Sequence, residues 1–194
     1  MRLAQRISRI KPSATLTINA KAKELKRNGV NIINFGVGEP DFGTPENIRE
    51  AATKSIRDGQ TRYTAVGGID ELKDAICRTV ETDYGLQYGR EHVLISCGGK
   101  HALYNLFLSL LDPGDEVIIP SPYWVSYPEM VELADATPVI VPCTQRSGYR
   151  LHPSDLEAAI TPNTRLLILN SPSNPTGKYY AEQHLKALSE VLLR

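Results

Sequence analysis

The fold can be inferred from one segment, Leu169-Asn170-Ser171-Pro172-Ser173-Asn174-Pro175-Thr176-Gly177. It follows the apolar run 166–169, which predicts a buried strand with this loop at its carboxyl end. Ligands of open α/β sheets bind at that end of the strands. Two prolines stiffen the loop, and Gly177 can adopt a positive φ angle. The loop therefore presents Asn174, an amide with two N–H donors, on a backbone with little freedom. The alternative is an ordinary proline-rich turn.

Size and charge exclude several classes of protein. The 194 residues suit one domain or one and a half, and they suffice for a hydrophobic core. The 22 basic residues balance the 22 acidic residues, which argues against binding of nucleic acid or of an anionic membrane. No apolar run approaches the roughly 20 residues that a membrane-spanning helix needs. Residues 1–11 are basic without a hydrophobic core, and we interpret them as an arm of the folded protein.

The cysteines and histidines predict neither a disulfide framework nor a metal site. The cysteines are odd in number and far apart: Cys77, Cys97 and Cys143. Without a C-x-x-C spacing, they favour reduced thiols in the cytoplasm. The histidines are scattered along the chain, at His92, His101, His152 and His184.

The first half of the chain predicts helices with little strand between them. Residues 15–27 predict a helix, and residues 32–35 predict a short strand. The next helix is expected to start with Thr44 as its N-cap and Pro45 at its first position. A third helix carries an apolar face formed by Ile69, Leu72, Ile76 and Val80, and it stops near Gly85.

From residue 93 onward, predicted strands and helices alternate. The strands are expected at 93–95, 116–119, 139–141 and 166–169, and the helices at 100–111, 124–134, from Ser154 and at 181–194. Residues 154–157, Ser-Asp-Leu-Glu, have the spacing of a capping box. Alternation of this kind predicts a mostly parallel, doubly wound α/β sheet. The last helix has no Gly, Asn or Pro to close it, so we expect that the sequence is cut there.

Two further strand-to-helix junctions carry residues suited to ligand binding. Residues 98–100, Gly-Gly-Lys, let backbone N–H groups at a helix N-terminus approach an anion, although such a pair also serves tight packing. Trp124 follows Ser121-Pro122-Tyr123 and offers a flat face to an aromatic ring, or anchors the loop as a half-buried side chain. With Asn174, three strand ends would surround one ligand.

The chain resembles the amino-terminal half of bacterial aspartate aminotransferases, which are class I pyridoxal-phosphate (PLP) enzymes of fold type I. The resemblance rests on residues 11–15 (KPSAT), 38–42 (GEPDF), 61–63 (TRY), 98–100 (GGK), 121–125 (SPYWV) and 171–177 (SPSNPTG). It implies a three-layer large domain with a mostly parallel sheet, helices on both faces, and truncation. Residues 1–44 would be the arm and part of a small domain, and residues 45–194 the first half of the PLP-binding domain.

The resemblance also implies a set of residues that bind the cofactor. The amides of Gly99 and Lys100, next to Gly98, would hold the cofactor phosphate. Trp124 would stack on the pyridine ring, and Asn174 would donate to the phenolic oxygen. Many relatives carry Ser in place of Gly98, so one hydroxyl contact is missing here. The resemblance further implies cis peptide bonds before Pro122 and before Pro175.

The substrate site implied by the resemblance adds residues from earlier in the chain. Gly38 would offer its backbone to the substrate α-carboxylate beside Trp124 and Asn174. Lys100 would pair with the distal carboxylate of a dicarboxylic substrate, although an exposed lysine often serves only solubility. The residues near the same end would be Lys11, Ser13 and Thr15. Tyr63 would reach the phosphate of the neighbouring subunit in a homodimer.

The expected function is transfer of an amino group, through PLP, between an amino acid such as aspartate or glutamate and a 2-oxo acid. By the resemblance, the lysine that forms the Schiff base lies beyond Arg194. We therefore expect no catalytic residue in this chain and no activity of the chain alone. One alternative is another fold type I PLP enzyme, a lyase or synthase. The other is a non-catalytic truncated fragment or an inert partner in a dimer.

Overall fold

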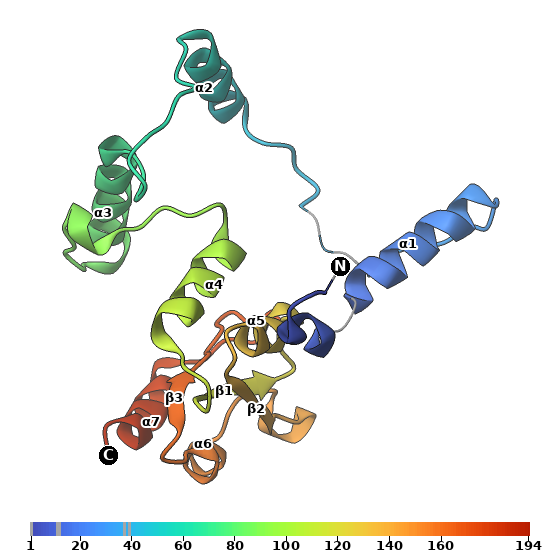
Figure 1. Ribbon diagram of the computed structural model, residues 1–194, viewed down its shortest axis with the longest axis vertical. Coiled ribbons are helices and arrows are strands. Elements are labelled where there is room, and N and C mark those ends of the chain that lie inside the picture. Colours follow the sequence, from blue (N-terminus) through green and yellow to red (C-terminus); the bar gives the residue numbers. More distant parts are fainter. Residues whose placement is uncertain (1, 11–12, 37, 39) are drawn as a thin grey trace. The chain divides into compact units, whose positions relative to one another are not determined.

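The computed structural model describes residues 2–10, 13–36, 38 and 40–194, which fall into two units. One unit is Ser13–Gly98, and its described residues form helices and connecting segments. The other unit is Gly99–Arg194 together with the amino-terminal residues, and it contains the sheet (Figure 1).

The sheet has three parallel strands in the order β2-β1-β3. The strands are β1 (Glu116–Ser121), β2 (Thr137–Pro142) and β3 (Thr164–Leu167). Ile118 of β1 is opposite Val139 of β2 and Leu167 of β3, so β1 is paired along both edges. The predicted parallel sheet is confirmed.

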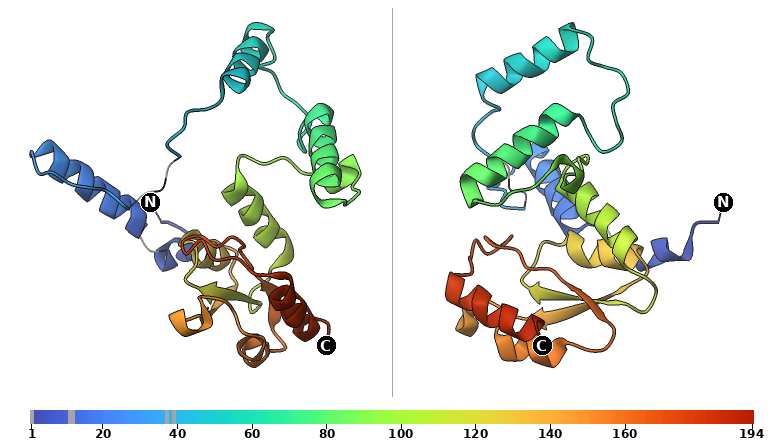
Figure 2. Two further views of the ribbon diagram at one scale, coloured as in Figure 1. Left: turned by 180° about the vertical axis from the view of Figure 1, so that it is seen from behind. Right: turned by 90° about the vertical axis from the view of Figure 1, so that its left-hand side faces the viewer.

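Two layers of helices cover the two faces of this sheet. Helices α4 (Gly99–Leu110) and α5 (Ser126–Leu133) lie on one face, and α6 (Pro153–Ala159) and α7 (Glu182–Leu192) lie on the other (Figure 2, right). The layers follow from the alternation of side chains along a strand. The fold is therefore the predicted three-layer α/β arrangement.

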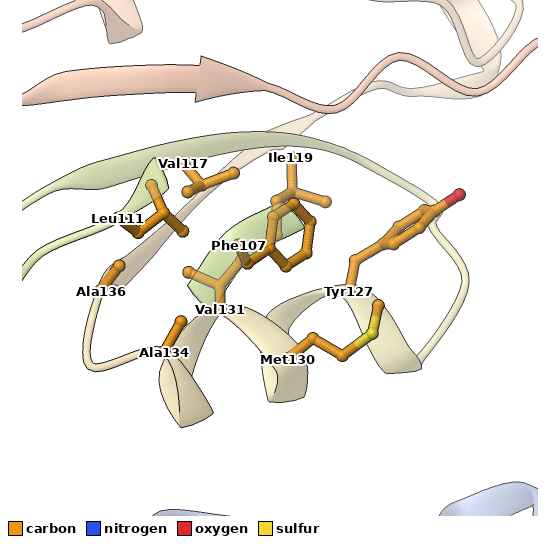
Figure 3. Close-up of a cluster of buried hydrophobic side chains, with 9 residues drawn as sticks. All are labelled: Phe107, Leu111, Val117, Ile119, Tyr127, Met130, Val131, Ala134 and Ala136. Atoms are coloured by element: carbon orange, nitrogen blue, oxygen red, sulfur yellow. The ribbon is translucent and has the colours of Figure 1, made fainter. Parts of the chain in front are cut away.

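The central strand supplies both hydrophobic cores. Val117 and Ile119 pack with Phe107 of α4 and Val131 of α5 (Figure 3). On the opposite face, Ile118 packs with helix residues Leu156 and Leu188. Since residues 117–119 have no exposed surface, each buried aliphatic side chain contributes about 1.5–3 kcal/mol. A run that is apolar at every position is typical of a strand buried on both faces.

The order of the elements places a crevice between β1 and β3. The chain leaves β1 towards α5 on one face, whereas it leaves the neighbouring strand β3 towards α7 on the other face. Loops that diverge from adjacent parallel strands in this way leave room for a ligand at the carboxyl ends of those strands.

The helical unit, Ser13–Gly98, contains α1 (Ala14–Arg27), α2 (Glu46–Arg57), α3 (Asp70–Tyr84) and the short helix η2 (Arg90–His92). The hydroxyl of Ser13 accepts a hydrogen bond from the Leu16 N–H at 3.3 Å and so caps α1. Gly85 ends α3 with a φ angle of 68°, as predicted. Arg90 donates to Asp74 at 2.6 Å, and this contact holds the pKa of the Asp74 carboxyl below its usual value.

Two predicted strands are not formed. Residues 32–35 and 93–95 are irregular in the structure. A strand requires a paired neighbour, and Phe35 remains 92% exposed. The Ile95 N–H donates instead to the Gly67 carbonyl at 3.0 Å. The apolar pattern was therefore not sufficient to form a strand in these two segments.

Two predicted helix starts also differ from the structure. Helix α2 begins at Glu46, so Pro45 is the capping residue and Thr44 precedes it. Helix α6 begins at Pro153, and the capping box predicted at Ser154 is absent. The Ser154 hydroxyl is hydrogen-bonded to the imidazole of His152 at 3.0 Å, so this hydroxyl does not cap the helix backbone.

Among the residues that the structure describes, no helix is long and apolar enough to cross a membrane. Within the same ranges, no three acidic, histidine or cysteine side chains gather where they could hold a metal ion.

The helical unit buries little of its apolar surface, and this predicts poor cooperativity. Leu16 and Ile56 are 68% and 67% exposed, and the buried side chains of the described chain all belong to the sheet unit. A unit without a packed core has no cooperative transition of its own. We expect the 194-residue chain, expressed alone, to melt broadly by circular dichroism and to bind the hydrophobic dye ANS. One sharp melting transition without dye binding would contradict this.

Candidate functional site

The crevice at the carboxyl ends of β1 and β3 is lined by the loops that leave these strands. Ser121, Pro122 and Tyr123 lie on one side, and Asn170 and Asn174 lie on the other. The space enclosed behind them is about 20 Å³, which admits little more than one water molecule. A ligand larger than water must therefore bind at the mouth of the crevice, against the exposed residues of the loops.

Internal hydrogen bonds fix the loop that carries Asn174. Its backbone N–H donates to the side-chain oxygen of Asn170 at 2.7 Å. The Gly177 N–H donates to the Ser173 carbonyl at 2.7 Å, and the Ser173 N–H donates to the Lys178 carbonyl at 2.8 Å. Gly177 has a φ angle of 67°, the conformation for which glycine was expected here. The backbone is thus held while the Asn174 side chain stays exposed.

The two predicted cis peptide bonds are present. They precede Pro122 and Pro175, one in each loop of the crevice. A third cis bond precedes Pro172, and the sequence reasoning did not anticipate it.

A second layer of contacts supports the Asn174 loop from behind. The Tyr180 N–H donates to the Ser171 hydroxyl at 3.1 Å, and the Tyr180 phenol accepts from the Leu151 N–H at 2.8 Å. The Arg150 guanidinium donates to the Tyr179 carbonyl at 2.9 Å. Burial raises the pKa of the Tyr180 phenol. The segment after β2 thus anchors the end of the loop, although no sequence motif indicated this role.

Trp124 follows Tyr123, a lining residue of the crevice, and contacts Lys100 of α4. Trp124 is half-buried, and Tyr127 packs edge-on against it with ring centroids 5.4 Å apart and planes at 89°. Tyr127 belongs to the core shown in Figure 3, and burial raises the pKa of its phenol. The Lys100 Nζ lies 5.0 Å from the centroid of the Trp124 ring, within the range of a cation–π contact.

The start of α4 is chemically suited to an anion. The N–H groups in the first turn of a helix have no helical acceptor, and the dipole makes this end positive. The first turn of α4 contains no acidic residue and includes Lys100. Gly98 has a φ angle of 87°, which a side chain would disfavour. A Cβ atom on Gly99 would meet nothing within 4 Å, so the space beside this amide is open. These residues fit a phosphate group.

The remaining predicted site residues lie outside the sheet unit or outside the described residues. Ser13 caps α1, and Thr15 lies within that helix. Gly38 and Tyr63 are exposed in connecting segments. Lys11 falls outside the described residues. The roles assigned to these five residues remain predictions.

One protein-family model matches most of the chain. The model described as "Aminotransferase class I and II" matches residues 30–194. The chain is 53% identical over 192 residues to the aspartate/prephenate aminotransferase of Cereibacter sphaeroides and covers 48% of it. It is 52% identical over 193 residues to the aspartate aminotransferase of Geobacillus stearothermophilus and covers 49% of it.

Solved structures give the same result for the fold. An aspartate aminotransferase from Rhizobium meliloti superimposes with a TM-score of 0.95 at 47% identity, and the match covers all of this chain and 48% of that one. The Thermus thermophilus aspartate aminotransferase with maleate gives 0.94 at 46% identity, with all of this chain and 51% of that one covered. The chain spans about half the length of the relatives that it matches, and it belongs to the class I and II aminotransferase family.

Proposed function

We propose that this chain is part of a PLP-dependent aminotransferase that moves an amino group between aspartate or glutamate and a 2-oxo acid. The proposal rests on one observation above all. The start of α4 and the loop after β1 adjoin through Lys100 and Trp124, and Asn174 faces that loop across the crevice. The relatives named aspartate aminotransferase support the choice of reaction.

The residues present suit the three chemically distinct parts of PLP. The first-turn amides at Gly99 and Lys100 suit the dianionic phosphate. The half-buried indole of Trp124 suits the flat ring, and the Asn174 amide suits the phenolic oxygen. When bound, the cofactor supplies the electron sink for bond changes at the substrate α-carbon. The role of this chain is to bind and orient the reacting groups and to exclude water from one side of them.

Lys100 supports a preference for dicarboxylic substrates. Its ammonium lies over the indole face on which an aromatic ring would stack, so ligand binding requires it to move. A distal carboxylate offers a stronger partner than an indole, because a hydrogen bond to a charged group contributes about 1.5–3 kcal/mol, whereas an exposed cation–π contact contributes about 0.5–1 kcal/mol. The Thermus relative was solved with maleate, which is a dicarboxylate.

The finer assignments carried by the family resemblance belong to the same proposal. Gly38 would contact the substrate α-carboxylate, and Lys11, Ser13 and Thr15 would lie near its distal end. The proposal also includes a homodimer in which Tyr63 reaches the cofactor phosphate of the neighbouring subunit.

The proposal places the working enzyme in the cytoplasm and assigns catalysis to the full-length protein that contains this chain. Residues 1–44 would form the arm and part of a small domain, and residues 45–194 would form part of the PLP-binding domain. The lysine that forms the Schiff base would lie outside this chain, so the chain alone would be inactive.

Lys100 can be tested by substrate preference. In the full-length protein, Lys100→Ala should lower kcat/KM for aspartate about 10- to 100-fold relative to that for phenylalanine, because one charge-assisted contact is lost. The control is Lys178→Ala, which removes an exposed lysine just after the Asn174 loop. A preference for aspartate that survives Lys100→Ala would exclude this role.

Asn170 can be tested by cofactor affinity. Its side chain holds the Asn174 N–H, so Asn170→Ala should loosen the loop and raise the Kd for PLP about fivefold, as expected for one hydrogen bond. The measurement is a titration of the full-length apoprotein with PLP. Asn163→Ala, at the opposite end of β3, should leave the Kd unchanged. Equal affinity of the Asn170 and Asn163 variants would contradict the supporting role.

A further inference from the structure

The amino-terminal arm is attached to the sheet unit by ion pairs to one carboxylate. The short helix η1 (Gln5–Arg9) packs against α5 (Figure 1). The Arg9 guanidinium donates to one oxygen of Asp135, and Arg6 lies 3.5 Å from the other oxygen. We call these three residues, Arg6, Arg9 and Asp135, the arm anchor.

Asp135 occupies a position that is unfavourable for an aspartate. It follows the end of α5, where the helix dipole is negative and repels a carboxylate. Its φ angle is 63°, in the left-handed region that glycine adopts most easily. A residue kept in an unfavourable conformation points to a use for its side chain. Here the Asp135 carboxylate binds the two arginines of the arm, and their positive charges offset the negative charge at this helix end.

The arm anchor has consequences for the segment that follows it. Four residues after Arg9 the chain reaches Ser13, and then Thr15, which are proposed to lie near the distal end of the substrate. Each residue extends the chain by at most about 3.6 Å, so fixing Arg9 limits where the next residues can lie. A free arm would lose more conformational entropy when substrate binds.

We propose that Asp135 is a positioning residue, which anchors the arm through Arg6 and Arg9 and thereby holds the start of the substrate-binding segment. Its effect on substrate rests on the proposed aminotransferase function, whereas the anchor itself does not. The side chains are between 32% and 45% exposed, so each pair contributes modestly. Loss of the anchor therefore releases the arm without unfolding the sheet unit.

The test uses Asp135→Asn in the full-length protein with PLP bound. Asparagine tolerates the left-handed conformation and keeps the size of the side chain, so the substitution removes the charge and one of the two acceptor oxygens without changing the backbone. Trypsin should cleave after Arg6 and Arg9 about three- to tenfold faster, because cleavage follows the population of the released arm. The KM for aspartate should rise about two- to fivefold with kcat unchanged, as expected for lost binding that is uniform along the reaction.

The matched control is Asp58→Asn. Asp58 is the C-cap of α2 and pairs with Lys54, so this variant also removes a charge and an ion pair at a helix end. It should change neither the cleavage rate nor the KM. In a double-mutant cycle, Asp135→Asn and Arg9→Gln should give non-additive effects on the KM for aspartate.

The possible results distinguish failure of the arm anchor from failure of the proposed aminotransferase function. Unchanged cleavage in Asp135→Asn would overturn the anchor, whatever the reaction. Faster cleavage with an unchanged KM for aspartate, or additive effects in the cycle, would overturn the positioning role. If the unmodified protein fails to transaminate aspartate, the proposed function falls while the cleavage rates still decide the anchor.

Discussion

The burial of β1 on both faces and along both edges is the constraint on which the rest of the sheet unit depends. Residues 117–119 must be apolar throughout, and their backbone groups must find partners in β2 and β3. Helices must then cover both faces, and the loops after β1 and β3 must part to reach them. The crevice that these loops leave is a consequence of how the core is packed, and it exists before any ligand binds.

The residues of the proposed site are held in place by contacts that do not depend on a ligand. Trp124 and Asn174 lie in the loops after β1 and β3, so the sheet positions each of them, whereas Gly99 and Lys100 lie at the start of α4, which does not follow a strand here. Asn174 depends on Asn170 and on the bonds made by Tyr180, while Trp124 depends on Tyr127 in the core. A rigid support of this kind limits the reorganisation needed when a cofactor binds. Lys100 is the exception, because its long side chain is free to exchange one partner for another.

Sequence reasoning predicted those parts that carry their own local signal. The strand at 116–119 was recognisable because a strand buried on both faces is apolar along its length, and the partly exposed strand at 139–141 because it is a short run of β-branched residues. The segment 93–95 is equally apolar, and 32–35 is apolar apart from Asn34, but neither has a neighbouring strand here, and pairing is not a local property. The arm anchor escaped prediction for the same reason, since Arg9 and Asp135 are 126 residues apart. The support of the loop by Arg150 likewise involves a contact between distant residues.

We propose that one phosphorylated pyridine ring fits between the start of α4, the loop after β1 and the loop after β3. A crystal structure of the full-length protein grown with PLP tests this arrangement most directly. We expect the phosphate within hydrogen-bonding distance of the Gly99 and Lys100 amides, the ring stacked on Trp124, and the Asn174 amide on the phenolic oxygen. Density for PLP away from these four residues would contradict the arrangement.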